Sequence, residues 1–559
     1  MTPATTTRLY ATLDSKAFVY QVKVNNLPQG HLREIIDFFK DKSFRRFHKD
    51  LNATSAYVNC DSEQAAKLVM QELEGIKFQN KWTLSTEYTK LSQSEFRKAY
   101  LQKSKKDKNS TRKVQQNRYQ TVINKIDPKI RIAQSIAPMH QRPYSKQLER
   151  KERFGQKYLT QLIKSISVLR PGLDEKGRAQ IAWVNEPCPF LGISPSPLLA
   201  EYKTDCTFTI GRDLQDNVSV GFLLGPDKNG EFGVIQPDKC PDITKKAKEI
   251  ADVLKTYIKE SKYDVYDPIK KKGLWHSVAV RTQSTGDVMI SVNMYANQLT
   301  QEELAEEKQK LQSYWEKWER DDKNAAMTLL LQTVQKDDTE NIFSGFKIQS
   351  TDILRGKGYV YEEIQKQKFR ISANTTDDFL GNIYVVETIL NNIKEWCGRS
   401  VRPTALLNFG CGVGIISNLL AKSMDEVFGV DESTEALKDA VVNAKINNVH
   451  NVTYCVGEIE NKLRSLNLEE KDIIAVIKAS QEGMDNSLIA ALRSADRLQK
   501  IIYLSFDPKK HMDDFKSLCR PLSSKFLGKP FKPSKAMIID SFPQKTQLLF
   551  MIEFERAVE

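Results

Sequence analysis

The sequence predicts a multidomain protein of mixed class, in which α+β regions precede a C-terminal α/β domain. Three observations support this prediction: residues 17–88 read as a compact βαββαβ unit, residues 144–340 hold short strands between turn residues, and residues 345–559 alternate strands with helices. At 559 residues the chain is long enough for two to four domains. We therefore expect several separate hydrophobic cores.

The N-terminal segment, residues 17–88, alternates two kinds of apolar pattern. Apolar alternation marks "VYQVKVNNL", "TSAYVNC" and "KWTLSTEY" as strands, and helical spacing marks "GHLREIIDFFKD" and "SEQAAKLVMQEL" as helices. This order resembles an RNA-recognition motif, whose two central strands carry aromatic side chains that stack on bases. Lys23 stands at the first-strand aromatic position and Ser55 where a second ring is usual, while Tyr57 remains. We expect this sheet to bind RNA weakly or to bind protein instead.

Residues 89–143 are predicted to form a basic linker. Between Leu91 and Arg150 there are 15 Lys and Arg against four Asp and Glu, so this segment supplies +11 of the formal net charge of +13. Such a cluster favours a polyanion such as RNA as partner. A solvated linker without a ligand stays open as the alternative. The cations that we single out as candidate RNA contacts are Lys105, Lys106, Arg112 and Lys113.

Residues 144–340 are predicted to form a β-rich region with helical flanks. The runs "CTFTIGR", "VSVGFLLG", "LWHSVAVRTQ" and "VMISVNMY" are short and bounded by Gly, Asp or Asn, which is typical of an all-β insert. The segment after them, residues 301–320, has the charge and spacing of an amphipathic helix. Thr300 and Glu303 provide the capping box at its start.

Residues 345–559 show the pattern of a doubly wound parallel sheet. We expect strands at "TALLNFG", "EVFGVD", "NVTYCVG", "DIIAVIK" and "KIIYLSF", and helices at 380–397, 415–423, 433–447 and 484–496. This is a Rossmann-like arrangement, in which ligands bind at the carboxyl ends of the strands.

A glycine-rich loop lies between the first of these strands and its helix. Gly410, Gly412 and Gly414 let the backbone approach a ligand at the helix N-terminus, and Asp431 ends the next strand, 17 residues beyond Gly414, where its carboxylate can accept hydrogen bonds from a ribose diol. NAD and S-adenosylmethionine both use this arrangement. The short loop and the C-terminal position of the domain favour S-adenosylmethionine. The alternative is a sheet that keeps its glycines only for the turn.

Composition narrows the class of protein further. A hydrophobic content of 40%, a charged content of 28% and the lack of an apolar run of 18 residues predict no membrane span. The eight cysteines contain no C-x-x-C pair, so we expect no zinc, redox or iron–sulfur site. The first residues show neither a secretory signal nor a transit peptide, and we expect a cytoplasmic or nuclear location.

Several long segments in one order resemble the metazoan tRNA uracil-5-methyltransferases. They include "PYSKQLERKE", "CPFLGISPSP", "LWHSVAVRT", "KFRIS", "FGCGVGIISNLLA" and "FKSLCRPLSSKFLGKPFKPSKAMIIDSFPQKTQ". The resemblance implies an RNA-recognition motif, a β-rich RNA-binding insert and a class I methyltransferase domain that uses S-adenosylmethionine on tRNA. Members of this family attack C6 of uracil with a cysteine thiolate, methylate C5 and remove the C5 proton with a glutamate. The thiolate is needed because C5 is a poor nucleophile until a covalent adduct forms.

The chain departs from the family at the residues that perform this chemistry. The motif that carries the cysteine reads Tyr503 to Pro508 here, with Phe506 at the nucleophile position. Leu549 occupies the place of the glutamate, and Lys478 stands at the first position of the family's D-P-P-R segment. We therefore expect a catalytically degenerate paralog, a pseudoenzyme that keeps the scaffold without the reaction.

Further departures fall on segments that the family associates with substrate or cofactor. They are Thr376-Asp377-Asp378-Phe379-Leu380 for F-F-Q-x-N, Tyr202-Lys203-Thr204-Asp205 for Y-R-N-K, and Asn408 for an aspartate before the glycine loop. Two alternatives to an RNA-binding pseudoenzyme remain open. One is an active methyltransferase of altered chemistry with Cys519 as a displaced nucleophile, although that cysteine matches one the family already has and a structural role is favoured. The other is a scaffold that binds an active methyltransferase or another protein.

Overall fold

The structure of the protein is a computed structural model, in which the chain forms two compact units, Met1–Val122 and Ile123–Glu559. It describes residues 18–29, 32–42, 44, 47–49, 53–60, 62–92, 126–225, 232–267, 272–321, 327–336, 346–375, 381–398, 402–457, 471–480 and 482–557.

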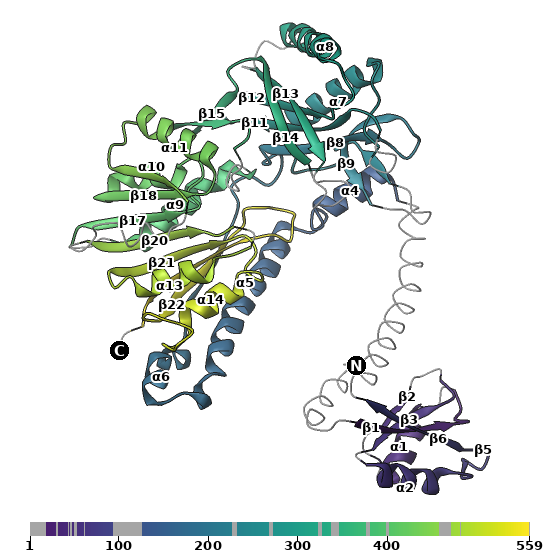
Figure 1. Ribbon diagram of the computed structural model, residues 1–559. Coiled ribbons are helices and arrows are strands. Elements are labelled where there is room, and N and C mark those ends of the chain that lie inside the picture. Colours follow the sequence, from purple (N-terminus) through teal and green to yellow (C-terminus); the bar gives the residue numbers. More distant parts are fainter. Residues whose placement is uncertain are drawn as a thin grey trace. The chain divides into compact units, whose positions relative to one another are not determined.

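The N-terminal unit holds a four-stranded antiparallel sheet with two helices packed on one face (Figure 1). Along the chain its elements are β1 (Phe18–Asn25), α1 (Leu32–Asp41), β2 (Phe47–Lys49), β3 (Ala56–Cys60), α2 (Glu63–Leu73) and β6 (Ser85–Ser92), with a hairpin of β4 (Lys77–Phe78) and β5 (Trp82–Thr83) before β6. The strand order is β2-β3-β1-β6. Val22 and Val24 face the helices, so Lys23 between them lies on the open face. The sequence patterns did not reveal β2, because it is only three residues long.

The C-terminal unit is built around an eight-stranded sheet whose strand order, within the described residues, is β19-β18-β17-β20-β21-β23-β22-β7. The strands are β17 (Thr404–Phe409), β18 (Glu426–Asp431), β19 (Val452–Val456), β20 (Asp472–Lys478), β21 (Leu498–Ser505), β22 (Phe531–Ile539), β23 (Leu549–Arg556) and β7 (Phe190–Ser194). Every described neighbour pair is parallel except those that include β23. The predicted doubly wound sheet is confirmed, with one reversed strand near its edge.

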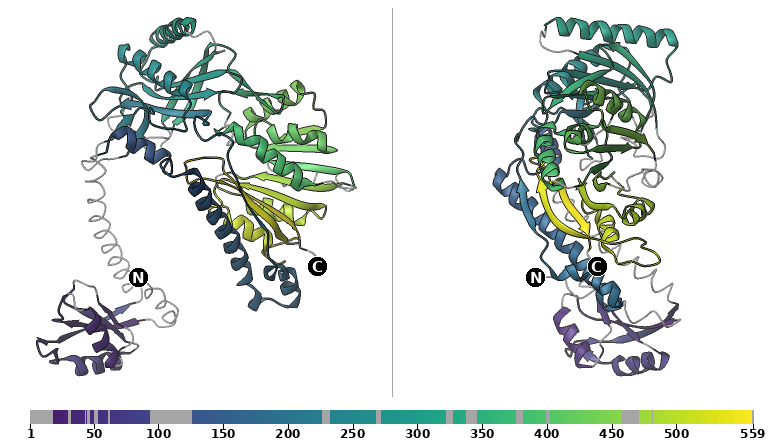
Figure 2. Two further views of the ribbon diagram at one scale, coloured as in Figure 1. Left: turned by 180° about the vertical axis from the view of Figure 1, so that it is seen from behind. Right: turned by 90° about the vertical axis from the view of Figure 1, so that its left-hand side faces the viewer.

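Helices cover both faces of this sheet (Figure 2). On one face lie α9 (Val386–Cys397), α10 (Ile415–Leu420) and α11 (Thr434–Ile446), and on the other lie α5 (Tyr144–Ser167), α13 (Asn486–Ser494) and α14 (Met512–Cys519). All six residues of β17 are buried, which is typical of a parallel strand covered on both sides. Short helical turns complete the fold, namely α6 (Glu175–Gln180), η1 (Arg170–Gly172), η2 (Ala182–Asn185), η4 (Ile383–Val385) and η5 (Ala421–Ser423).

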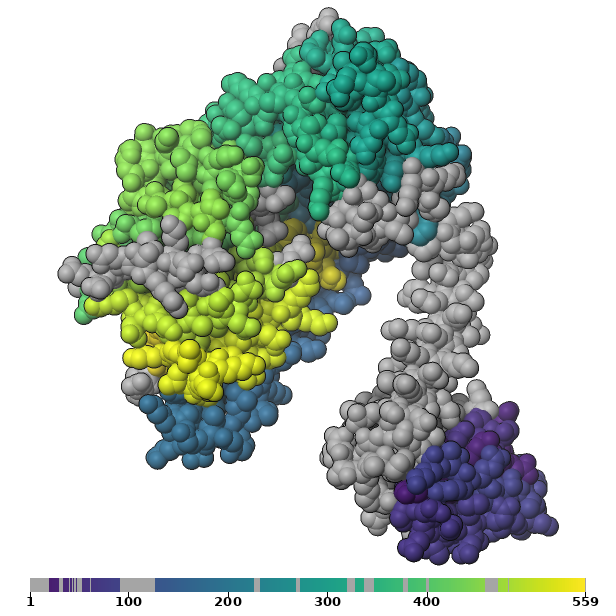
Figure 3. All heavy atoms as spheres, in the orientation of Figure 1, coloured from purple at the N-terminus to yellow at the C-terminus, as the bar shows by residue number. Residues whose placement is uncertain are grey.

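Strand β7 is part of this sheet and helix α5 packs on it, although the sequence analysis assigned both elements to the β-rich region at residues 144–340. Leu159, Leu162 and Ile166 of α5 pack into the core between α5 and the sheet, and β7 extends the sheet beside β22. Figure 3 shows the blue surface of the α5–α6 segment against the yellow C-terminal segment, where the Leu522 amide donates a hydrogen bond to the Gln180 side chain at 2.8 Å. The break between these two parts of the chain therefore falls after β7.

The insert that follows forms a seven-stranded sheet, in the order β10-β9-β8-β11-β12-β13-β14. Its strands are β8 (Asp205–Arg212), β9 (Val218–Leu224), β10 (Gly233–Ile235), β11 (Trp275–Thr282), β12 (Val288–Met294), β13 (Met327–Lys336) and β14 (Phe346–Arg355). A hairpin of β15 (Tyr359–Ile364) and β16 (Gln367–Ser372) leads on to the eight-stranded sheet. The four strands predicted in this region are confirmed.

The expectation of an all-β insert is wrong, because three helices pack on one face of this sheet. They are α4 (Pro128–Ile136), α7 (Lys245–Glu260) and α8 (Gln301–Asp321). Helix α7 has an apolar stripe at helical spacing, from Ala247 to Ile258. It was not predicted, because the interpretation of this region followed the strand patterns on either side. Helix α4 lies within residues 89–143, so the end of the expected linker is part of the folded unit. The predicted capping box of α8 is confirmed, since the Thr300 amide donates to Glu303 at 2.9 Å and the Glu303 amide to the Thr300 hydroxyl at 3.2 Å.

Helix α11 supplies hydrogen bonds to the outer edge of β16. Asn447 bonds both backbone groups of Lys368, Asn443 bonds both backbone groups of Arg370, and the Asp439 carboxylate accepts from the Ser372 amide. The three side chains are four residues apart along the helix, a rise of about 6.0 Å, and the three strand residues are two apart, a rise of about 6.6 Å. The helix and the strand edge therefore match in spacing. Asn443 also donates to the Val413 carbonyl in the glycine loop at 3.0 Å. The helix thereby ties the β15–β16 hairpin to that loop.

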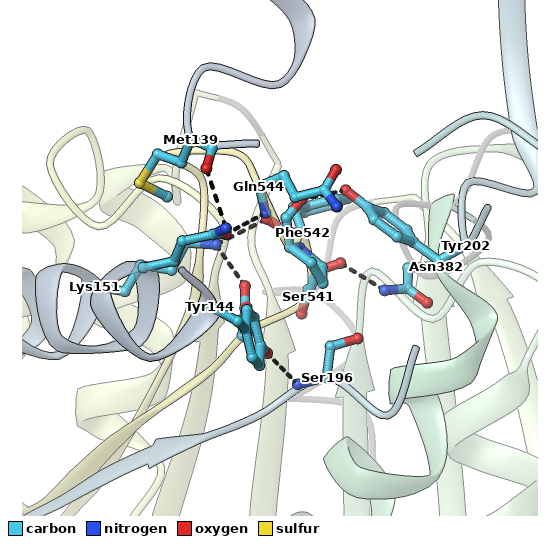
Figure 4. A network of polar contacts seen from close by, with 12 residues as sticks. Met139, Tyr144, Lys151, Ser196, Tyr202, Asn382, Ser541, Phe542 and Gln544 are labelled. Atoms are coloured by element: carbon cyan, nitrogen blue, oxygen red, sulfur yellow. Dashed lines mark hydrogen bonds and ion pairs between the residues drawn. The ribbon is translucent and has the colours of Figure 1, made fainter. Parts of the chain in front are cut away.

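A buried ion pair anchors the loop after β22, residues 540–544 (Figure 4). Lys151 on α5 contacts Asp540 at 2.5 Å with both side chains fully buried, and Tyr144 donates to the other oxygen of Asp540 at 2.8 Å. Lys151 also donates a hydrogen bond to the Phe542 carbonyl at 2.8 Å, so it satisfies a backbone group of the loop as well as the Asp540 side chain. Burial lowers the pKa of Lys151, while Asp540 opposes that effect. The charge is retained in the core because both partners are present.

We expect Lys151→Met to destabilise the C-terminal unit by about 3–5 kcal/mol, because Asp540 would stay buried without its cation. Urea unfolding followed by tryptophan fluorescence measures this change. The matched control is Lys146→Met on the same helix, where the exposed Lys146 pairs with the exposed Glu149 at 2.7 Å and a loss of about 0–1 kcal/mol is expected. Equal losses in the two variants would contradict the anchoring role of Lys151.

Candidate active site

Five residues that the sequence singled out lie along the carboxyl edge of the parallel strands. Gly410 follows β17, Asp431 ends β18, Lys478 ends β20, Phe506 follows β21 and Leu549 begins the reversed strand β23. The register places Lys478 opposite Leu504, and Leu549 opposite Ile539 at the end of β22. The fold thus brings together residues that are up to 139 positions apart in sequence, at the edge where such sheets bind ligands.

The glycine loop is shaped by its protein neighbours. Gly410, Gly412 and Gly414 have positive φ angles of 67°, 55° and 84°. A Cβ atom on Gly410 would lie 2.4 Å from the Lys478 carbonyl oxygen, and one on Gly414 would lie 2.3 Å from the Tyr454 hydroxyl. Both positions therefore require glycine for steric reasons that involve no ligand.

The Asp431 carboxylate holds this loop against the start of α11. One oxygen accepts from the Gly412 amide at 2.8 Å and the other from the Ser433 amide at 2.9 Å. Asp431 is half-buried, and each carboxylate oxygen has a further lone pair with which to accept a ribose hydroxyl. Asp431 therefore lies beside the loop and has a structural task there, while its predicted role as a ribose acceptor stays a prediction.

Two buried amide side chains, those of Asn408 and Asn418, lie beneath the loop. Asn408 donates to the Ser417 hydroxyl at 2.9 Å, and Asn418 donates to the Gly414 carbonyl at 2.8 Å and to the Tyr454 hydroxyl at 2.9 Å. The side-chain oxygens of Asn408 and Asn418 are buried without a hydrogen-bond partner among the described residues. Burial raises the pKa of Tyr454, so its hydroxyl stays protonated. Asn418 and Tyr454 carried no signal in the sequence, because their role comes only from packing.

Phe506 and Leu549 lie against one apolar cluster. Leu549 is fully buried in the core that also contains Leu504 and Ile539, and the half-buried Phe506 packs against the same core. The rings of Phe506 and Phe542 have centroids 5.9 Å apart. A nucleophilic thiolate and a carboxylate base are absent from both motif positions, and the surroundings of Leu549 are apolar.

A buried hydrogen-bonded histidine beside this edge was missed in the sequence. The Ser505 hydroxyl lies 2.7 Å from His511 Nδ1, and His511 Nε2 lies 2.9 Å from the Ser480 carbonyl oxygen. Because a carbonyl only accepts, Nε2 carries the proton and Nδ1 accepts from Ser505. Ser505 is 0% and His511 2% exposed, so this pair joins the ends of β20 and β21 and presents no reactive hydroxyl to a substrate.

Cys519 lies away from the carboxyl edge. It is the last residue of α14, fully buried in the core on the face of the sheet opposite the apolar cluster of Leu549. Burial raises the pKa of its thiol, which disfavours the reactive thiolate. The geometry supports the structural role that the sequence favoured for this cysteine.

The candidate RNA contacts fall in different places. Tyr57 lies on the open face of the N-terminal sheet, directly opposite Lys23, and Lys23 pairs with Glu87 at 3.5 Å. Tyr202 is fully buried, with its hydroxyl bonded to the Pro543 carbonyl at 2.8 Å. Of the residues that the sequence analysis singled out, those outside the described part of the chain are Lys105, Lys106, Arg112, Lys113 and 376–380.

The described residues contain neither a candidate membrane span nor a candidate metal cluster. No helix among them is long and apolar enough to cross a membrane. Within the same residues, no three His, Cys, Asp or Glu side chains gather as a metal ion would require.

Comparisons with known proteins place the chain among RNA methyltransferases. The "Methyltransferase domain" family model matches residues 402–540. The mouse protein named tRNA (uracil-5-)-methyltransferase homolog A is 30% identical over 437 residues, which cover 76% of this chain and 69% of the mouse protein. The zebrafish homolog B is 27% identical over 433 residues, or 76% and 87% of the two chains.

A solved structure shows the same fold. It is the Pyrococcus abyssi tRNA (uracil-54, C5)-methyltransferase in complex with S-adenosyl-L-homocysteine, at 18% identity and a TM-score of 0.50, over 74% of this chain and 83% of that one. The chain is 30% identical to the mouse homolog over 69% of that protein's length, which identifies the family. The chain belongs to the tRNA (uracil-5-)-methyltransferase family.

Proposed function

We propose that this protein binds RNA, most simply tRNA, and does not methylate uracil. The observation that carries the proposal is the apolar cluster at the carboxyl edge, in which Phe506 and Leu549 occupy the motif positions of the nucleophile and the base. Uracil C5 reacts only after a nucleophile has added to C6, and the C5 proton must then be removed. Neither a benzyl group nor an isobutyl group performs these steps.

The scaffold around these positions supports retention of binding. The buried pair of Lys151 and Asp540 still holds the loop that carries Phe542, and Asp431 still ties the glycine loop to α11. The relatives are named for tRNA, and the basic segment 91–150 supplies most of the net positive charge. An RNA partner fits these features through phosphate contacts.

S-adenosylmethionine is a weak candidate ligand of the same edge. Asp431 offers an acceptor for the ribose diol and the loop amides lie beside it. Gly410 and Gly414 are weaker evidence for a cofactor than their spacing in the sequence suggested. The Lys478 carbonyl and the Tyr454 hydroxyl already require glycine at these two positions.

We expect the purified protein to transfer no methyl group from labelled S-adenosylmethionine to unmodified tRNA, with an active family member as the positive control. Phe506→Cys alone should also give no turnover, because Leu549 cannot remove the C5 proton. Turnover by the unaltered chain above a heat-inactivated sample would refute the proposal in favour of an active enzyme.

We expect RNA affinity to depend mainly on charge in residues 97–118. Replacing the nine Lys and Arg of this segment by Gln at constant length should weaken binding and flatten the salt dependence, since each phosphate neutralised contributes about 0.7–0.9 to the slope of log K against log salt. Filter binding between 50 and 200 mM salt measures both effects. A variant with the same residues in shuffled order should bind like the unaltered chain. If the neutral variant keeps both affinity and slope, RNA binding by this segment is wrong and a protein-binding scaffold is favoured.

We expect calorimetry to detect at most millimolar binding of S-adenosylmethionine, an affinity of about −4 kcal/mol, and Asp431→Ala to abolish it. The control is Glu432→Ala, because Glu432 is an exposed neighbour. Heat that persists unchanged in Asp431→Ala would show that the ribose contact is wrong. No heat in any variant would show that the loop serves only as a turn.

A further inference from the structure

An open cavity of about 610 Å³ lies between the end of α7 and the middle of α8, on the helical side of the insert sheet. Its volume is within the range of small-molecule sites. The side chains that define its chemistry are Tyr257, Glu260, Glu306, Glu307, Lys310 and Tyr314. None of them belongs to the carboxyl edge of the eight-stranded sheet, so the cavity is separate from the candidate active site.

Glu307 places a buried carboxylate side chain at this cavity. The side chain is 2% exposed, and one carboxylate oxygen accepts from the Tyr257 hydroxyl at 2.7 Å and from the Ser261 hydroxyl at 3.4 Å. Burial raises the pKa of Tyr257, and its bond to Glu307 raises it further, so the phenol remains a donor. No Lys or Arg of the described residues lies within 4.0 Å of the Glu307 carboxylate. A buried carboxylate that accepts from two hydroxyls and has no cation beside it favours a cationic ligand over a neutral or anionic one.

The two lysines of the cavity are held at its rim by another glutamate. Lys262 pairs with Glu306 at 3.1 Å and Lys310 pairs with Glu306 at 2.6 Å. The third acid of the lining, Glu260, has no ion pair among the described residues. With three glutamates against two lysines, the lining has a net charge of −1.

Aromatic rings form the wall next to Glu307. The ring centroids of the lining residues Tyr257 and Tyr314 are 5.0 Å apart. Trp275, which is fully buried and does not line the cavity, meets Tyr257 edge to face at 5.9 Å. Ring faces attract organic cations, especially where water is excluded. A hard metal ion would instead need six or more oxygen ligands, and a single buried carboxylate between aromatic rings does not supply them.

We propose that this cavity binds a primary alkylammonium group, and that its ligand is a free polyamine such as spermidine. One ammonium group contacts the Glu307 carboxylate and the tyrosine rings, and the rest of the chain extends toward Glu260 at the rim. The proposal is independent of the RNA-binding function, because it uses none of the same residues.

The test is calorimetry of the nuclease-treated full-length protein with spermidine. We expect one site per chain, and a loss of affinity of at least tenfold in Glu307→Gln, since glutamine keeps the size and an acceptor for Tyr257 but removes the charge. Glu302→Gln is the matched control, because Glu302 is an exposed glutamate of the same helix outside the cavity, and its affinity should not change. Tyr314→Leu provides a second variant with an expected loss of about fivefold.

Several outcomes would overturn the proposal. They are no heat at 10 mM spermidine, equal affinity in Glu307→Gln and Glu302→Gln, or equal heat with magnesium chloride. Tighter binding of a lysine-containing peptide than of spermidine would show that the ammonium group comes from a protein, which contradicts the polyamine assignment. Glu307→Gln should leave RNA affinity unchanged, so a failure here is distinct from a failure of the proposed function.

Discussion

The buried ion pair between Lys151 and Asp540 is the contact on which the arrangement of the C-terminal unit depends. It joins a helix early in this unit to the end of a strand almost 390 residues later. Around it, the four carbonyls from Ser541 to Gln544 each have a partner: Asn382 bonds Ser541, Lys151 bonds Phe542, Tyr202 bonds Pro543, and the Met139 amide bonds Gln544. Each partner comes from a different segment, so one loop connects the insert, helix α5 and the eight-stranded sheet. A polar loop of this kind can be buried only when its backbone groups are satisfied.

A second set of polar contacts connects the insert with the glycine loop. Arg281 of the insert sheet pairs with Asp205 at 3.0 Å and donates to the Ser372 carbonyl at 2.8 Å and to the Thr375 carbonyl. Ser372 in turn bonds Asp439 on α11, and Asn443 on the same helix reaches Val413 in the loop. These contacts position the hairpin and the loop without a ligand. They explain how a scaffold stays ordered in a family member whose motif positions hold Phe506 and Leu549, because fold stability depends on packing and satisfied polar groups and not on the reactive side chains.

The sequence alone determined the alternation of strands and helices in the C-terminal domain, the glycine loop, the acid after the next strand and the replacement of the nucleophile and base. These features are local, because strand and helix periods and motif spacings are read within one segment. The resemblance carried by the long segments identified the family before any geometry. Strand β2 and helix α7 were not predicted, for different reasons. The strand has only three residues, and the helix, despite its apolar stripe, lies in a region whose neighbouring strands dominated the interpretation.

Only the tertiary structure decided which side chains meet. Spacing suggested that Gly410 and Gly414 serve a cofactor, whereas the fold places the Lys478 carbonyl and the Tyr454 hydroxyl where their side chains would lie. Cys519 follows Phe506 by 13 residues, yet it is buried on the opposite face of the sheet. The packing of α5 and β7 with the eight-stranded sheet, the buried Lys151–Asp540 pair and the burial of Glu307 likewise depend on contacts between distant segments. A single sequence records the residues of such contacts but not their pairing, because long-range packing brings together positions that no local period relates.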